Sequence, residues 1–184
     1  MGRRQYQYLD ADGELLASVK QIEGGRPPGK LGRMFAVERD RTRTVLEAVS
    51  PDGTPIFAIE RPGKELDNLS APIVYFPDGS RAGRIHSDPL VDGRGHDRWR
   101  IMQDRWQLRD ANDAVQGVAE QRIFKKTGLF RAPSHSDKVD YSDPSGTRIA
   151  HFDGKRLDIN FPLPDVLQLL VVATPIAFDL LDGA

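Results

Sequence analysis

The feature that most restricts the possible folds of this chain is its C-terminal segment, which is almost entirely apolar from Leu163 to Leu181. Upstream of this segment the chain consists of short runs in which polar and apolar residues alternate. A helix of roughly 18 residues would be about 27 Å long. Because so apolar a helix is unfavourable in water, it must either be buried within the protein or be inserted into a membrane.

Polar residues within the segment favour burial over a membrane span. A span usually needs about 20 predominantly apolar residues, and Asp179 would be costly near the centre of a bilayer. On a helical projection, four polar residues share one narrow stripe: Asp165, Gln168, Asp179 and Asp182. The rest of the circumference carries the predicted core positions Leu167, Leu170, Val171, Ile176, Phe178 and Leu181. We therefore predict a core helix over about 164–181 that touches solvent along one seam.

Five hairpins are predicted upstream, each with a turn between two short alternating runs. The turns are expected at Asp12-Gly13, Asp52-Gly53, Asp78-Gly79, Asn112-Asp113 and Ser145-Gly146. Glycine, Asn and Asp are favoured there because tight hairpin turns require a positive φ. In the run from Pro55 to Glu60, Phe57 and Ile59 alternate with Ile56, Ala58 and Glu60, which predicts a strand with two distinct faces. The sheet is expected to be antiparallel.

These observations together predict a mainly β fold with a helical core. About twelve strands over residues 4–162 would leave two exposed edges, which proteins commonly remove by closing the sheet. A closed barrel of that size encloses more volume than its own side chains fill, and the apolar helix can occupy it. We therefore expect a single domain over residues 1–184, a closed antiparallel barrel of about twelve strands around a central hydrophobic C-terminal helix.

Three stretches of the sequence resemble the phospholipid scramblases. The tail DINFPLPDVLQLLVVATPIAFDLLD (158–182) is similar to the end of that family, FAIERP (57–62) resembles its strand ending in Glu-Arg-Pro, and PDGSRAGRI (77–85) resembles its next turn and strand. The LURP-one-related proteins and, more distantly, the tubby C-terminal domain are relatives of this family. The resemblance implies a tubby C-terminal-like barrel of twelve strands around a central helix.

The resemblance also raises the question of calcium. In scramblases an acidic loop before the FPL strand is proposed to bind this ion, and Asp153 and Asp158 occupy the corresponding region here. Lys155 opposes a cation in this loop, and calcium needs six or more oxygen ligands. We therefore expect no metal and no cofactor, with Asp153 and Asp158 as turn and surface residues.

The remaining motifs give no support for an enzyme. The chain has no cysteine, which excludes a disulfide framework, a thiolate metal site and a cysteine nucleophile. It also lacks the GxSxG, P-loop and HExxH patterns. Its formal net charge of −1 argues against nucleic acid as a partner. The N-terminus shows no apolar signal segment, so a cytoplasmic location is expected, with a peripheral position at the inner face of the membrane as the alternative.

Basic residues provide the candidate binding site. Arg39, Arg41 and Arg43 alternate, so an extended segment would place them on one face, and the arginine fork suits phosphate oxygens. The alternative is a solvated outer wall in which basic and acidic side chains are mixed. The leading hypothesis is a non-enzymatic module that binds anionic phospholipid headgroups at a membrane surface. The alternatives are lipid translocation with the C-terminal helix in the membrane, and an intracellular scaffold or regulatory protein that binds another protein.

Overall fold

The computed structural model describes residues 5–24, 43–63, 71–88, 103–124 and 134–182. Eleven strands and one helix lie in these ranges. They are β1 (Gln5–Leu9), β2 (Leu15–Glu23), β3 (Thr44–Val49), β4 (Pro55–Arg61), β5 (Ile73–Tyr75), β6 (Arg81–Asp88), β7 (Gln103–Asp110), β8 (Val115–Phe124), β9 (Ser134–Ser142), β10 (Arg148–Phe152), β11 (Leu157–Ile159) and α2 (Asp165–Asp182).

The five predicted hairpin turns are confirmed. They join β1 to β2, β3 to β4, β5 to β6, β7 to β8 and β9 to β10, and every one of these pairs is antiparallel. Four of the turns place a glycine at positive φ: Gly13, Gly53, Gly79 and Gly146. In the fifth turn Asp113 adopts a φ of 68°, a conformation that Asp tolerates better than most residues. The local turn chemistry therefore sets the strand boundaries.

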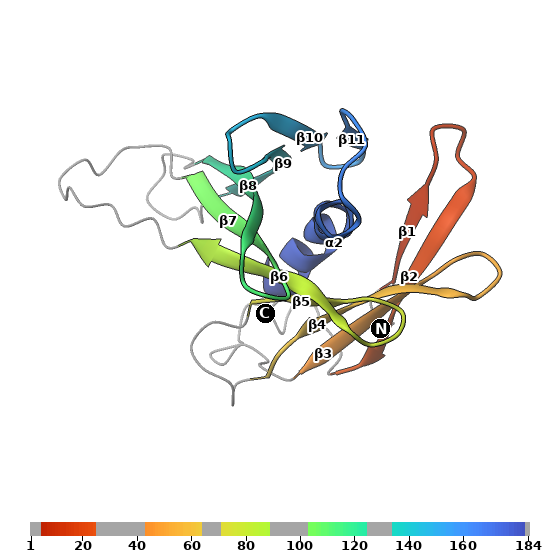
Figure 1. Cartoon of the computed structure of the whole chain (residues 1–184). Coiled ribbons are helices and arrows are strands. Elements are labelled where there is room, and N and C mark those ends of the chain that lie inside the picture. The colour runs from red at the N-terminus through yellow and green to blue at the C-terminus, as the bar shows by residue number, and fades with distance from the viewer. Residues whose placement is uncertain (1–4, 25–42, 64–70, 89–102, 125–133, 183–184) are drawn as a thin grey trace.

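All eleven strands form one antiparallel sheet in sequence order, from β1 to β11. The sheet curves around α2, which lies on its concave side (Figure 1). Among the described strands no pairing joins β1 to β11, so these two are the edges of the sheet. The mainly β fold with a C-terminal helix is thus confirmed, whereas closure into a twelve-stranded barrel stays a prediction.

The core is built by the inner face of the sheet against α2. Leu170 and Val171 are fully buried, and Leu167, Ile176 and Phe178 are less than 10% exposed, as the sequence predicted. The aromatic rings of Phe178 and of Trp106 in β7 lie 5.1 Å apart between centroids. Leu181 belongs to α2, but its side chain is outside the part of the chain that the structure describes. Burial of the large apolar side chains along α2 provides most of the driving force for docking the helix.

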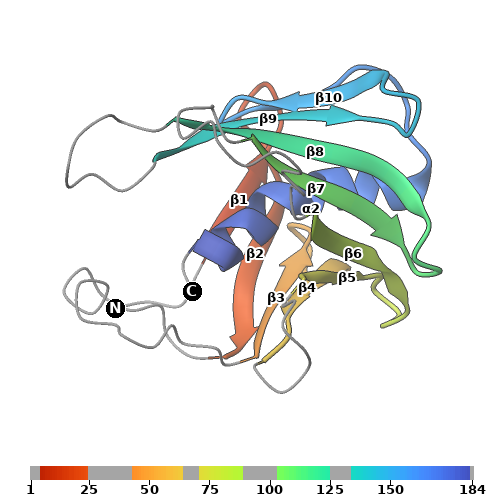
Figure 2. The ribbon, with the colours of Figure 1, turned by 90° about the vertical axis from the view of Figure 1, so that its left-hand side faces the viewer.

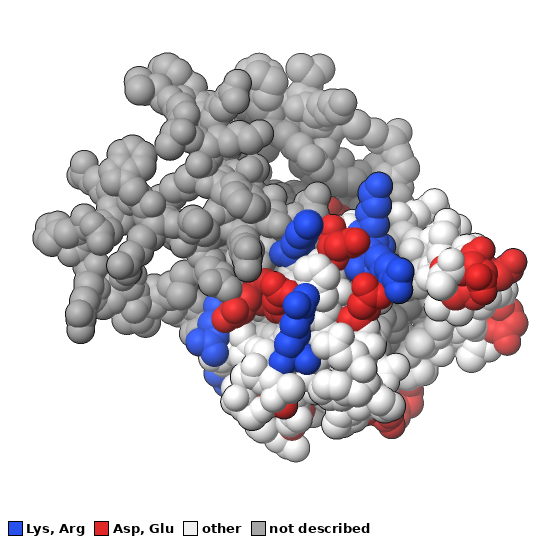
Figure 3. Space-filling view, turned by 90° about the horizontal axis from the view of Figure 1, so that it is seen from above, with Lys and Arg blue, Asp and Glu red and all other residues white. Residues whose placement is uncertain are grey.

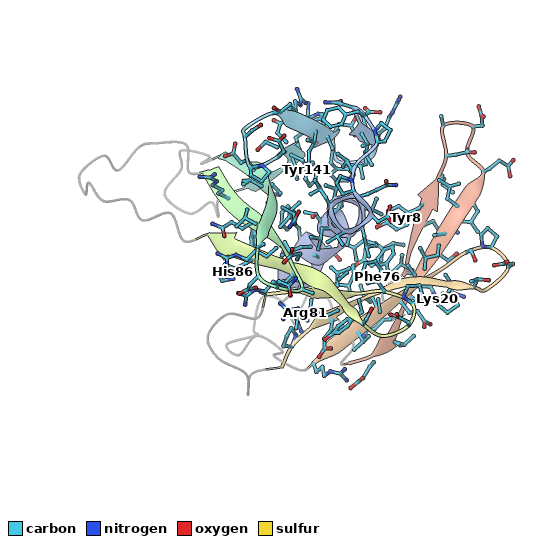
Figure 4. All side chains as sticks on the ribbon, in the orientation of Figure 1. Tyr8, Lys20, Phe76, Arg81, His86 and Tyr141 are labelled. Atoms are coloured by element: carbon cyan, nitrogen blue, oxygen red, sulfur yellow. The ribbon has the colours of Figure 1, made fainter. Side chains whose placement is uncertain are left out.

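The predicted polar seam of α2 is also present. Asp165, Gln168 and Asp179 are exposed, and the side chain of Asp182 lies outside the described part of the chain. From β1, the hydroxyl of Tyr6 donates a hydrogen bond to Asp179, and the hydroxyl of Tyr8 donates one to the Val172 carbonyl at 2.8 Å. Tyr8 and Tyr141 lie on either side of α2 (Figure 4). Edge strand β1 therefore contacts the helix through tyrosine hydroxyls as well as through apolar packing.

The antiparallel order gives the sheet two different ends. Because the five tight turns all follow odd-numbered strands, they lie at one end of the sheet, which we call the turn end. The last residues of β2, β4, β6 and β8 lie at the opposite end, which we call the loop end. Helix α2 begins after β11, near the turn end, and finishes at the loop end (Figure 2).

Candidate functional site

Of the three arginines predicted to bind headgroups, only Arg43 lies in the described part of the chain. It immediately precedes β3, at the loop end, and its side chain is 49% exposed. Arg39 and Arg41 fall outside the described residues. Their shared face with Arg43 therefore stays a prediction.

Arg43 is already engaged by two carboxylates. Its Nε donates to Glu60 Oε1 at 2.6 Å, and its Nη1 pairs with Glu23. The Tyr75 hydroxyl also donates to Glu60, at 3.1 Å. The hydrogen bond from Arg43 lowers the pKa of Glu60 below its ordinary value, although partial burial opposes this shift. A phosphate group would have to compete with both Glu23 and Glu60 for this guanidinium.

A second arginine at the loop end is buried. Arg61, the last residue of β4, is 5% exposed, and its Nη1 donates to the Leu180 carbonyl at 3.0 Å. Its Nη2 donates to the Thr44 hydroxyl at 3.4 Å. The last turn of α2 has no basic residue of its own. Arg61 therefore provides the positive charge that the carbonyl end of a helix favours, and it fixes α2 to β4.

Sequence reasoning did not identify this role of Arg61. The alternation of β4 contained the signal, because Arg61 shares the inward face with Phe57 and Ile59. A charged side chain in phase with two buried apolar ones requires a buried partner. The adjacent Glu60 points to the outer face and binds Arg43 instead. The Glu-Arg pair of the FAIERP stretch thus has structural partners on both faces of the sheet.

The degenerate calcium-loop residues have local hydrogen-bond partners. The backbone N–H groups of Lys155 and Arg156 both donate to Asp153 Oδ1, at 2.9 and 2.8 Å, and these bonds lower the pKa of Asp153. The carboxylate of Asp158 accepts a hydrogen bond from Arg156 Nε at 2.6 Å. No group of three or more His, Asp or Glu side chains suited to a metal ion occurs within the described ranges.

The outer wall formed by β9, β10 and β11 carries mixed charges. Asp140 pairs with both Arg148 and His151, each at 2.8 Å. Viewed from above, basic and acidic side chains are interspersed over the described surface (Figure 3). This face fits the alternative interpretation of a solvated wall better than a lipid-binding surface.

Acidic residues are concentrated in the tight turns. The turn residues 10–14, 50–54, 76–80, 110–114 and 143–147 contain no Lys or Arg, although Arg81, Arg109 and Arg148 adjoin them. They contain eight carboxylates: Asp10, Asp12, Glu14, Asp52, Asp78, Asp110, Asp113 and Asp143. Most serve the turns themselves; Asp143 Oδ1, for example, accepts from the backbone N–H groups of Ser145 and Thr147, both at 2.9 Å. Hydrogen bonds from neighbouring serine hydroxyls, followed by those from backbone N–H groups, lower the pKa values of Asp52, Asp78 and Asp143.

The segments that join strands at the loop end have the opposite composition. Residues 25–42 contain five Lys or Arg and two acidic residues, and residues 125–133 contain three Lys or Arg and none. Residues 89–102 add three Arg and two Asp, and only residues 64–70 have an acidic excess. Although these segments lie outside the described residues, the strands to which they are attached end at the loop end. A chain of net charge −1 therefore attaches the acidic turns to one end of the sheet and, apart from residues 64–70, segments with an excess of Lys and Arg to the other.

Comparisons of the chain with models of known protein families, with curated proteins and with solved structures find no match. In the described part of the chain, α2 is also not long and apolar enough to cross a membrane.

Proposed function

We propose that this chain is a non-enzymatic module, related to the phospholipid scramblases and LURP-one-related proteins, that binds anionic phospholipid headgroups at the cytoplasmic surface of a membrane. The observation that supports the proposal is the separation of charge between the two ends of the sheet. An anionic surface attracts the basic segments 25–42 and 125–133, and it repels the carboxylates of the turn end. Arg39 and Arg41 belong to residues 25–42, which hold five of the Lys and Arg residues in these two segments.

The closed barrel is the structural part of this proposal. With eleven antiparallel strands, β1 and β11 run in the same direction. A twelfth strand that ran antiparallel to both would complete the alternation and remove both edges. The polar seam of α2 would then face that strand.

Lipid translocation is less well supported by the position of α2. That activity would require the helix to leave the core, exposing Leu170, Val171 and Phe178 and releasing the bond between Arg61 and Leu180. A protease-protection assay of the tail on vesicles separates the two functions. If vesicles protect the residues after Leu163 from the protease, translocation is supported. If cleavage of these residues is the same with and without vesicles, surface binding with the helix in the core is supported.

The test of the main proposal is flotation of the purified protein with vesicles of phosphatidylcholine alone or mixed with phosphatidylserine. We expect binding only to the mixed vesicles, weaker at near-physiological salt than at low salt and unaffected by calcium. The variant Arg39→Glu/Arg41→Glu should lose this binding. The matched control is Arg105→Glu, because Arg105 is an exposed arginine on β7 that pairs with Glu120 at 3.8 Å.

Two outcomes would overturn the proposal. Equal binding to neutral and anionic vesicles would show that charge is not recognised. No binding under any condition would remove the lipid hypothesis and leave the scaffold or regulatory function, with a protein as the partner.

A further inference from the structure

A cluster of three arginines surrounds one carboxylate on the outer face of the sheet, close to the turn end. Arg81 and Arg84 belong to β6, and Arg109 is the next-to-last residue of β7. Asp113 lies in the turn between β7 and β8. Arg84 Nη2 donates to Asp113 Oδ2, whereas Arg81 Nη2 and Arg109 Nη1 remain 3.8 Å from its two carboxylate oxygens. Arg81 lies on the opposite side of the sheet from α2 (Figure 4). We call these four residues the arginine cluster.

The charges of the arginine cluster do not balance. Among the described residues, Asp113 is the only carboxylate that pairs with any of the three guanidinium groups, so two positive charges are left uncompensated. Arg84 and Arg109 also stand directly opposite each other across β6 and β7. Like charges in that position destabilise a sheet. Repulsion between the arginines therefore destabilises the free protein, and a bound anion would reduce this repulsion.

The donors of the cluster are only partly used. The Nε of Arg84 is buried and has no hydrogen-bond partner in the described structure, and Arg81 has a single long ion pair. Arg109 directs Nε and Nη2 to Gln107 Oε1, at 2.9 and 2.6 Å, which fixes its guanidinium and turns Nη1 toward Asp113. The side chains of the three arginines are between 26% and 38% exposed. Apart from the buried Nε of Arg84, the guanidinium groups of the cluster can therefore be reached by a ligand from solvent.

The nearest turn carboxylates do not neutralise the cluster. Asp78 Oδ1 accepts from the backbone N–H and the hydroxyl of Ser80, at 2.8 and 2.6 Å. Asp110 accepts from the backbone N–H of Ala114 at 2.9 Å and from Gln116 Nε2 at 2.8 Å. Both carboxylates are held by their own turns and pair with no arginine of the cluster.

We infer that Arg81, Arg84 and Arg109 form a binding site for a phosphomonoester group. Arginine forks match phosphate oxygens in geometry, and a phosphomonoester at neutral pH carries nearly the two negative charges that the cluster lacks. Asp113 occupies the site in the free protein and yields part of its contact with the arginines when the phosphate binds. This site lies near the turn end, away from the basic segments of the loop end, so it does not rest on the proposed membrane function.

The experiment is an NMR titration of the full chain with inorganic phosphate at low ionic strength, followed through the arginine Nε–H signals. Arg84→Gln and Arg109→Gln should each weaken phosphate binding at least fivefold. Arg105→Gln is the matched control, since Arg105 lies on the same strand but has its own carboxylate partner, and it should bind as the unaltered protein does. Equal weakening by Arg105→Gln would show that only the overall charge matters and would overturn the proposal.

Removing the central carboxylate tests the inference in the opposite direction. Asp113→Asn keeps a residue that tolerates the positive φ of this turn and removes the competing charge. We expect it to tighten phosphate binding at least threefold, whereas a purely structural cluster would show unchanged or weaker binding. Asp113→Gly serves the same purpose if the Asn variant is poorly folded, because glycine also adopts this φ.

The source of the phosphate is resolved by two further probes. Glycerol 3-phosphate presents a soluble phosphomonoester, and vesicles containing phosphatidic acid present the same group on a membrane. Competition by glycerol 3-phosphate indicates a soluble ligand, and binding to phosphatidic acid alone indicates a lipid. Vesicles of phosphatidylserine, which carries a phosphodiester, report on the proposed function separately, so either proposal can fail without the other. Failure of all three phosphomonoester probes would overturn the inference.

Discussion

At the scale of single residues, Arg61 makes the least expected contribution to the fold. A guanidinium that is 5% exposed normally needs partners for its charge, and here it donates to the Leu180 carbonyl and the Thr44 hydroxyl. Replacing it should leave the carbonyl end of α2 without its bond from β4. The helix would also lose the positive charge nearest its C-terminal end.

We therefore predict that Arg61→Gln lowers the free energy of unfolding by about 2 kcal/mol, the usual magnitude for a hydrogen bond that involves a charged group. Urea denaturation followed by circular dichroism measures this change. The control Arg105→Gln, at an exposed ion pair, should change stability by less than about 0.5 kcal/mol. Equal stability of the two variants would contradict the assigned role of Arg61.

At the residue scale, features with a local cause were predicted from the sequence. Contacts between residues far apart in the chain were not. The turn residues Gly13 and Asp113 were predicted because positive φ is a property of one residue. The partners of Arg43 and Arg61 come from strands and a helix far along the chain, and a single sequence does not show which residues meet. The arginine cluster has the same origin, since Arg84 and Arg109 are brought together only by the register of β6 and β7.

At the scale of elements, α2 was the most predictable part of the molecule. Its bounds, Asp165–Asp182, agree with the predicted 164–181 because its apolar and polar residues follow the helical period closely. The predicted number of strands depended on chain segments that are not described, such as 25–42 and 89–102. Whether the sheet closes depends on how its two edges meet, and this is a property of curvature rather than of local pattern.

The burial of α2 can be tested by charge at matched positions. Leu170 is fully buried and Gln168, two residues earlier on the same helix, is exposed. We predict that Leu170→Asp abolishes cooperative unfolding, because an unpaired buried charge costs several kcal/mol out of the modest net stability of a domain. Gln168→Asp should melt within a few degrees of the unaltered protein. Thermal circular dichroism and size-exclusion chromatography measure both, and a folded, monomeric Leu170→Asp protein would show that the helix is not the core.

At the scale of the whole molecule, a chain of nearly neutral composition attaches acidic turns at one end of the sheet and mostly basic segments at the other. The acidic tight turns follow odd-numbered strands and the basic segments follow even-numbered ones, so antiparallel order alone separates them. Net charge, at −1, does not reveal this arrangement. The charge balance, which argued against nucleic acid as a partner, is therefore compatible with an excess of Lys and Arg in the segments that are attached at the loop end.

This arrangement predicts the orientation of the protein on a membrane. The chain has no cysteine, so a single introduced cysteine can carry a fluorophore without ambiguity. On vesicles containing phosphatidylserine, a label at Lys126→Cys should become protected from an aqueous quencher. A label at Ala11→Cys, in the exposed turn between β1 and β2, should remain as accessible as in solution. Because screening weakens attraction between exposed charges, the protection at position 126 should decrease as salt is raised. Equal protection of both labels would mean that the two ends of the sheet do not differ in their affinity for the anionic surface, and protection at position 11 alone would reverse the orientation.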